Sequence, residues 1–277
     1  MKVLQILPQL NIGGVERGTL DLSKALIHKG HQAFVISGGG VLVDELTQCG
    51  AKHYEIPVHI KSLRTLSLAK RLSETISSID PDIVHVRSRM PAWVNYRAFK
   101  MLQKKPLLVS TFHGLYSFPI YSKVMSFVDH SIAISKTVER YILENYKLDK
   151  DDITVIPRGC DPLEFNNEVI NPVDKANIIE EFPQIVGKKV LTIPGRITKW
   201  KGVAEFIDLL SLLDDNYHGL IVGPTAKSKK KYLNKLQYKV SSLNLEDKIT
   251  FTGSRRDIAN IYKISDIVFN LSQTPEP

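Results

Sequence analysis

The sequence predicts an α/β protein built from parallel sheets that helices cover on both faces. Short apolar runs, typical of buried strands, alternate with longer segments in which apolar residues recur every three or four positions, as in helices. Strands buried on both faces are continuous apolar runs of this kind, and parallel sheets contain such strands. Because the chain has 277 residues and domains average about 150, we expect two such domains.

The first domain is expected to span residues 1–165. Its predicted strands are short runs dominated by Val, Ile and Leu, at residues 3–7, 33–36, 83–86, 107–111, 132–134 and 153–156. The predicted helices of this domain are residues 15–29, 68–79 and 136–146. The second helix ends before Pro81, because proline lacks the N–H donor and clashes with the preceding turn.

The alternation breaks at residues 166–187, where Pro, Asn and Asp cluster, and we interpret this stretch as a linker with one short helix. A second domain, residues 188–277, follows. Its predicted strands are residues 189–193, 219–222, 249–251 and 267–269, and its predicted helices are residues 203–210 and about 226–243. No covering helix follows the last strand, so we expect this domain to be incomplete and its last strand to stay partly exposed.

In parallel sheets ligands bind beyond the carboxyl ends of the strands, so the loops that follow the strands are candidate sites. Gly13 and Gly14 follow the first strand. Paired glycines admit a ligand close to the backbone, and the next helix offers free N–H groups to an anion. A tight turn explains this pair equally well. The glycines at 38–40 are more simply a flexible loop than a phosphate cradle.

Three other positions carry reactive or charged side chains. His113 lies at the end of a predicted strand, where it could donate, accept or carry a proton. Arg196 and Lys201 lie beside the positive end of a helix, and two cations there suit a diphosphate. The alternatives are a structural histidine and an exposed basic turn. Asp80 and Asp82 match the D-x-D pattern of some metal-dependent transferases, but they precede a strand, so we interpret them as structural.

The formal net charge of +8 favours an anionic partner such as a nucleotide, a phosphorylated lipid or a membrane surface. The lysine-rich predicted helix, about residues 226–243, lacks interleaved aromatic residues and any nucleic-acid motif, so we expect no nucleic-acid binding.

Cys49 and Cys160 lack the spacing of a metal site or a disulfide framework. No apolar run reaches the ~18 residues of a membrane span, and no signal-peptide pattern occurs, so we expect a cytoplasmic protein.

Taken in order, these segments resemble the family 4 (group 1) glycosyltransferases, retaining sugar-nucleotide transferases with the GT-B fold. The resemblance covers the whole chain, and six motifs carry it: Gly13–Arg17, Asp82–His85, Thr111–Gly114, Val155–Asp161, Gly195–Gly202 and Ser272–Pro277. Each motif is weak alone, but their common order is strong support. Arg158 and Cys160 depart from the family's usual Asn and Val.

The resemblance implies two Rossmann-like domains facing a cleft, the first binding the acceptor and the second a nucleotide sugar. The sugar would move with retained configuration, without a metal or a cofactor. Arg196 and Lys201 would neutralise the departing diphosphate, with help from backbone N–H groups near Gly13 and Gly14. His113 would be a catalytic residue that hydrogen-bonds the donor sugar.

Glu276 would be the other catalytic residue, as the first of the family's two glutamates, and would orient the hydroxyl groups of the donor sugar. The second glutamate would lie beyond Pro277, so we expect the chain to be a fragment of a longer enzyme, inactive as it stands. The expected acceptor is a glycan or a lipid-linked molecule of bacterial envelope polysaccharide or lipopolysaccharide synthesis. Such an acceptor implies peripheral contact with an anionic surface, at the inner face of the cytoplasmic membrane.

Three alternatives are open. A non-catalytic partner protein of the same fold would not need the second glutamate. A sugar-nucleotide epimerase shares the GT-B architecture, but the Gly-Arg and Lys-Gly pairs and the Pro-Glu-Pro ending favour the transferase. A dinucleotide-dependent oxidoreductase is disfavoured, because no G-x-G-x-x-G follows any predicted strand.

Overall fold

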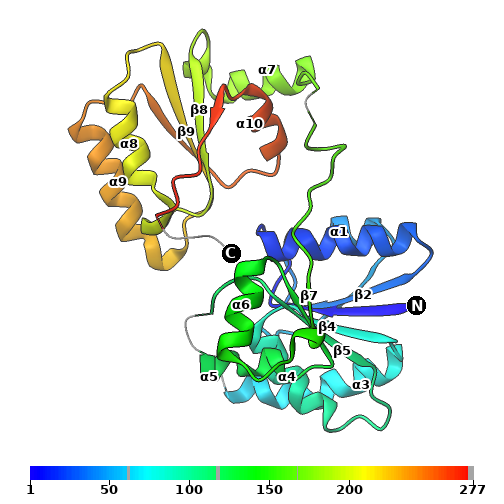
Figure 1. Cartoon of the computed structure of the whole chain (residues 1–277). Coiled ribbons are helices and arrows are strands. Elements are labelled where there is room, and N and C mark those ends of the chain that lie inside the picture. Colours follow the sequence, from blue (N-terminus) through cyan, green and yellow to red (C-terminus); the bar gives the residue numbers. More distant parts are fainter. Residues whose placement is uncertain (61–62, 117–118, 167, 274–277) are drawn as a thin grey trace. The chain divides into compact units, whose positions relative to one another are not determined.

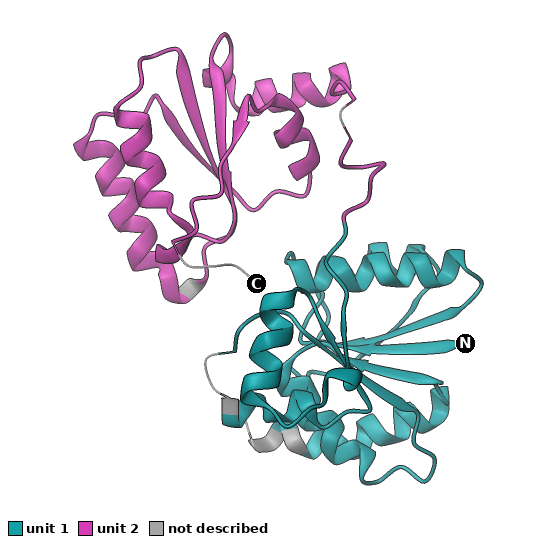
Figure 2. Cartoon of the chain, viewed as in Figure 1, with its two compact units in different colours: residues 1–159, 277 teal, residues 160–276 magenta. Residues whose placement is uncertain are grey.

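The computed structural model describes residues 1–60, 63–116, 119–166 and 168–273 (Figure 1). The chain folds into two compact units, one of residues 1–159 and one that begins at Cys160 (Figure 2). Each unit contains one sheet, and the strands described in each sheet pair in parallel. The predicted α/β class is therefore confirmed.

The first unit is built on a seven-stranded sheet in the order β3-β2-β1-β4-β5-β6-β7. Its strands are β1 (Lys2–Ile6), β2 (Gln32–Ser37), β3 (Lys52–Glu55), β4 (Ile83–Val86), β5 (Leu107–Phe112), β6 (His130–Ala133) and β7 (Ile153–Val155). The sequence analysis missed β3. This strand lies at the edge of the sheet and is partly exposed, so it lacks the apolar run of a buried strand.

Two apolar cores lie on the two faces of this sheet. Phe34 and Ile36 of β2 pack in one core, and the alternate residues Ala33 and Val35 pack in the other. The helices of the unit are α1 (Gly14–His28), α2 (Val43–Gln48), α3 (Ala69–Ile79), α4 (Arg89–Phe99), α5 (Pro119–Ser122) and α6 (Lys136–Asn145). In the part of the chain that the structure describes, no helix has both the length and the apolar character needed to span a membrane.

The second unit has a four-stranded sheet in the order β10-β9-β8-β11. The strands are β8 (Lys189–Pro194), β9 (Tyr217–Val222), β10 (Ile249–Gly253) and β11 (Ile267–Val268), and the helices are α7 (Pro172–Glu181), α8 (Val203–Ser211), α9 (Lys230–Ser242) and α10 (Ile258–Ile264). This sheet also has an apolar core on each face. Ile267 and Val268 are 51% and 43% exposed, in agreement with the expected exposure of the last strand.

The stretch expected to be a linker, residues 166–187, packs as part of the second unit. Ile178 and Phe182 lie in an apolar core with Val190 of β8 and Ile261 of α10. The one short helix expected in this stretch is α7, which Asn171 caps: its Oδ1 accepts a hydrogen bond from the backbone N–H two residues later. The division between the units therefore follows Gly159 and precedes the expected boundary at 165.

The two cysteines differ in exposure. Cys160, the first residue of the second unit, is exposed. Cys49 is half-buried, and its thiol donates a hydrogen bond to the Leu46 carbonyl at 3.0 Å. Both are free thiols, as their separation in the sequence predicts.

Gly223, directly after β9, lies close to the backbone of the loop that follows β8. Its φ is 153°, and a Cβ at this position would lie 1.9 Å from the carbonyl oxygen of Gly195. Strand β9 can therefore end beside the loop that follows β8 only if residue 223 has no side chain.

We expect Gly223→Ala to lower the free energy of unfolding of the second unit by at least about 2 kcal/mol, because both the backbone conformation and the contact with Gly195 are incompatible with a Cβ. Gly187→Ala is the matched control, since Gly187 has a φ of 73° but no atom within 4 Å of the added Cβ, and it should cost about 1 kcal/mol. Urea unfolding of both variants measures the difference. Equal losses of unfolding free energy in the two variants would contradict a close contact between residue 223 and Gly195.

Candidate functional site

The carboxyl edge of the first sheet brings together residues from four loops. The glycine pair Gly13 and Gly14 joins β1 to α1, Arg87 follows β4, His113 follows β5, and Arg158 follows β7. We call these five residues the glycine-loop site. Two members, Arg87 and Arg158, were not among the residues that the sequence analysis selected.

Arg158 connects the glycine pair to His113. Its Nη1 donates to the Gly14 carbonyl, and its Nη2 lies 2.7 Å from His113 Nδ1. A Cβ on Gly14 would lie 2.9 Å from Arg158 Nη1, so the close approach of the guanidinium requires glycine there. The structure thus joins two of the predicted site residues through a third that was not predicted.

The amino-terminal end of α1 lies beside this arginine. Gly13 is the N-cap residue, and no side chain accepts a hydrogen bond in the capping position. The Glu16 carboxylate lies close to Gly13, since a Cβ built there would be 2.4 Å from Glu16 Oε2. A carboxylate in the first turn is favoured by the partial positive charge of the helix end. The site therefore already contains one negative charge beside its cations.

Arg87 is 7% exposed, and its guanidinium lies against Gly18 of α1. Its Nη1 donates to Gln5 Oε1 at 2.7 Å and more weakly to the Gly18 carbonyl at 3.4 Å. Nε is buried and has no hydrogen-bond partner among the described residues. Burial lowers the pKa of Arg87 to about 10, with a further contribution from Arg158, so the guanidinium stays charged at neutral pH.

Two histidines of this region are neutral. His85 is buried on β4, with its Nε2 2.7 Å from Thr111 Oγ1, and burial followed by the charge of Arg87 lowers its pKa to about 3. Burial, then Arg87 and Arg158, lower the pKa of His113 to about 2. At neutral pH His113 can therefore donate or accept a hydrogen bond, but it does not carry a proton reversibly.

The second unit carries the other predicted cations in the loop after β8. We call Arg196 and Lys201 the basic turn. Arg196 is exposed, whereas Lys201 is half-buried and its ammonium lies 4.6 Å from the centre of the Trp200 ring. Gly202 is the N-cap of α8 and provides no capping side chain, and Lys201 directly precedes it in the chain. This arrangement can bind an anion.

The remaining predicted residues lie elsewhere or outside the described part of the chain. Glu276 is outside the described residues. Asp80 and Asp82 lie at the amino edge of the first sheet, where Asp80 pairs with Lys104 at 2.8 Å and Asp82 Oδ2 accepts from the backbone N–H of Lys2 at 2.7 Å.

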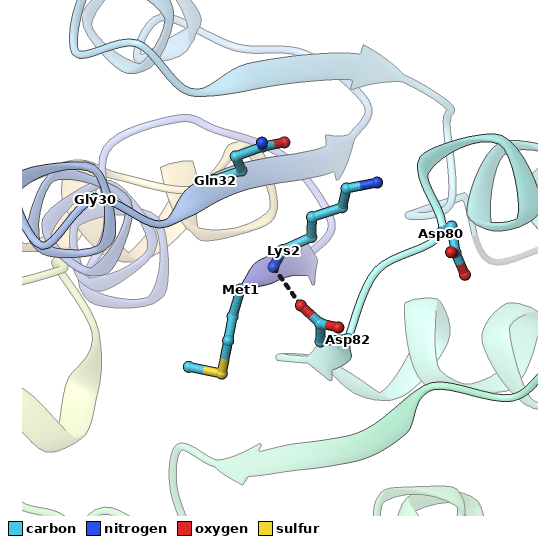
Figure 3. A pocket seen from close by; sticks show the side chains of 6 residues that line it. All are labelled: Met1, Lys2, Gly30, Gln32, Asp80 and Asp82. Carbon is cyan, nitrogen blue, oxygen red and sulfur yellow. Dashed lines mark hydrogen bonds between the residues drawn. The ribbon is translucent and has the colours of Figure 1, made fainter.

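Asp80 and Asp82 border a cavity of about 340 Å³ at this amino edge, together with Met1, Lys2, Gly30 and Gln32 (Figure 3). Ligands of parallel sheets bind at the opposite edge. Both carboxylates already have structural partners, in agreement with their interpretation as structural residues.

Residues 12–163 match the family model described as Glycosyltransferase Family 4, and residues 174–277 match Glycosyl transferases group 1. A solved glycosyltransferase from Rickettsia africae is 35% identical with a TM-score of 0.82, and the match covers 99% of this chain and 74% of that chain.

Two more distant matches extend over nearly the whole chain. The N-acetyl-alpha-D-glucosaminyl L-malate synthase of Bacillus anthracis is 23% identical, over 95% of this chain and 71% of its own length. Anabaena HepE, solved in complex with UDP-glucose, has a TM-score of 0.84 at 21% identity, over 100% of this chain and 75% of that chain. At this identity the likeness to HepE shows the fold alone.

The two neutral histidines predict that the first unit loses stability in mild acid. In the unfolded chain a histidine has a pKa near 6.5, so below about pH 6.5 the unfolded state binds protons that folded His85 and His113 do not. We expect the free energy of unfolding to fall between about pH 7 and pH 5, by at most about 1.4 kcal/mol per pH unit for each histidine.

Urea unfolding of the first unit at several pH values measures this slope. His85→Gln and His113→Gln should each reduce it. A slope that neither His85→Gln nor His113→Gln alters would contradict the neutral state of these histidines.

Proposed function

This chain belongs to the family 4 and group 1 glycosyltransferases, and on that premise we propose that it moves a glycosyl group from a nucleotide sugar to an acceptor with retained configuration. The observation that supports the proposal is the basic turn, in which Arg196 follows β8 and Lys201 directly precedes the N-cap of α8. A diphosphate is the part of a nucleotide sugar that such a site suits best.

In this reaction the main electrostatic task is to stabilise the departing diphosphate. Arg196 and Lys201 are basic side chains, and the N–H groups at the start of α8 add partial positive charge. Lys201 is half-buried against Trp200, which limits its motion and reduces the solvent around its ammonium. We therefore assign diphosphate binding to these two side chains, within the second unit.

The first unit contributes the glycine pair and His113. Backbone N–H groups at Gly13 and Gly14 would assist with the diphosphate, and neutral His113 would hydrogen-bond a hydroxyl group of the donor sugar. Glu276 would orient other hydroxyl groups of the sugar. UDP-glucose, bound in the HepE complex, makes a uridine diphosphate sugar the first donor to test.

We propose that the reaction needs no metal ion, because two fixed cations provide the charge that a metal otherwise supplies. Asp80 and Asp82 lie at the other edge of their sheet and have partners of their own. Transfer should accordingly proceed in EDTA.

We propose an anionic or lipid-linked glycan of the bacterial envelope, such as a lipopolysaccharide precursor, as the acceptor class. The net charge of +8 supports contact with an anionic surface. The protein would then work in the cytoplasm, in peripheral contact with the membrane.

We expect Arg196→Ala and Lys201→Ala in the full-length protein each to lower kcat/KM by roughly 30-fold or more. Losing a charge contact with a buried phosphate costs about 2–5 kcal/mol, and about 1.4 kcal/mol corresponds to tenfold in rate. The assay follows release of the nucleoside diphosphate over a panel of nucleotide sugars, with and without EDTA.

Lys199→Ala is the matched control. Lys199 is an exposed lysine of the same turn, and its substitution removes the same positive charge. Its kinetics should stay close to those of the unaltered protein. Unchanged kinetics in both Arg196→Ala and Lys201→Ala would exclude the assigned diphosphate site. No turnover with any nucleotide sugar would instead favour a non-catalytic partner protein.

We expect the protein to bind vesicles that contain anionic lipid, and to bind them more weakly as salt increases. Each basic residue near an anionic surface contributes about 1 kcal/mol, and salt screens this attraction beyond about 10 Å at 0.1 M. Co-sedimentation with anionic and with neutral vesicles measures the difference. Equal binding to the two would argue against an electrostatic membrane contact.

A further inference from the structure

The contact between Arg158 and His113 determines which imidazole nitrogen can donate. Arg158 Nη2 lies 2.7 Å from His113 Nδ1. A guanidinium has only N–H donors, so Nδ1 must be the acceptor and carries no proton. In a neutral imidazole the proton is then on Nε2. We propose that Arg158 is a positioning residue that holds His113 in the Nε2–H tautomer, so that His113 meets the substrate as a hydrogen-bond donor.

The other nitrogen of the ring is left for a ligand. Within the described residues, His113 Nε2 has no hydrogen-bond partner although it is buried. A buried N–H group without an acceptor is unfavourable until an oxygen atom reaches it. A sugar hydroxyl provides such an oxygen. This step rests on the proposed function, because the transfer reaction is what would bring a sugar to this ring.

The groups around His113 all favour the neutral ring. Burial is the largest cause that lowers the pKa of His113, and the charges of Arg87 and Arg158 lower it further. Tyr116 accepts a hydrogen bond from the backbone N–H of His113, and burial raises its pKa, so its hydroxyl stays protonated. Burial lowers the pKa of both arginines, and the nearby carboxylate of Glu16 opposes that shift. Donation from Nε2 is therefore the chemistry available to His113 at neutral pH.

Arg158 suits this role because both of its terminal nitrogens are engaged. Nη1 donates to the Gly14 carbonyl, which holds the planar guanidinium against the start of α1 while Nη2 points at the imidazole. Lysine has a single ammonium and cannot make both contacts in one fixed geometry. Asparagine is shorter and has one amide nitrogen, so it could not make both contacts either.

Nitrogen NMR of the imidazole tests the tautomer directly. The full-length protein is labelled with ¹⁵N-histidine, and His113→Gln identifies the signals of His113 among the eight histidines. We expect a pyridine-type Nδ1, shifted by the hydrogen bond from Arg158, and a pyrrole-type Nε2. In Arg158→Met the Nδ1 resonance should move to the position of an imidazole without that bond, and in Arg158→Lys it should move part of the way.

Arg97→Met is the matched control. Arg97 is an exposed residue of α4 in the same unit, and its loss removes the same charge without touching the site. The His113 signals should not change in this variant. A pyrrole-type Nδ1 in the unaltered protein, or an Nδ1 resonance that is the same in Arg158→Met, would overturn the proposal.

Kinetics separate this proposal from the proposed function. If His113 donates to the sugar, Arg158→Met should lower kcat/KM by about tenfold, the effect of losing one charge-assisted hydrogen bond, and Arg158→Lys should restore part of it. Full activity in Arg158→Met together with an altered Nδ1 signal would overturn the positioning role. A protein that transfers no sugar would overturn the proposed function, while the NMR spectra still decide the tautomer.

Discussion

The first unit depends on one buried cation. Arg87 is held by Gln5 Oε1 of β1 and by the Gly18 carbonyl of α1, and no carboxylate among the described residues hydrogen-bonds to it. Burying a charge is costly unless fixed dipoles replace the lost water. The strand, the helix and the loop after β4 must therefore keep one arrangement around this guanidinium. Burial first, and then the charge of Arg87, lower the pKa values of His85 and His113.

Strands and helices with a clear pattern of apolar residues could be predicted from the sequence. Elements that form only because a neighbouring element pairs or packs with them could not. Strands such as β1 and β5 are mostly apolar because both of their faces are covered. The polar segment Lys52–Glu55 becomes β3 only because β2 offers it an edge to pair with. The 166–187 segment appeared to be a linker because its composition marks the start of α7 but does not reveal the packing of Ile178.

The same distinction applies to the candidate site. Gly13, Gly14 and His113 could be selected from the sequence because they follow predicted strands. Arg158 could not, because its contact with Gly14 joins residues that are 144 positions apart in the chain. Its place directly after the last strand of the unit, where the family usually has Asn, was the available signal. Arg87 likewise follows a strand, but sequence alone does not reveal that Gln5 is its partner.

The exposed thiol of Cys160 has a practical consequence. It lies two positions after Arg158 in the sequence, whereas the other thiol, Cys49, is half-buried and donates to a carbonyl. An electrophilic dye should therefore attach preferentially at residue 160. The fluorophore would stand close to the guanidinium that contacts Gly14 and His113, without altering any residue of the glycine-loop site. The natural sequence thus already provides an attachment point for an optical sensor of ligand arrival.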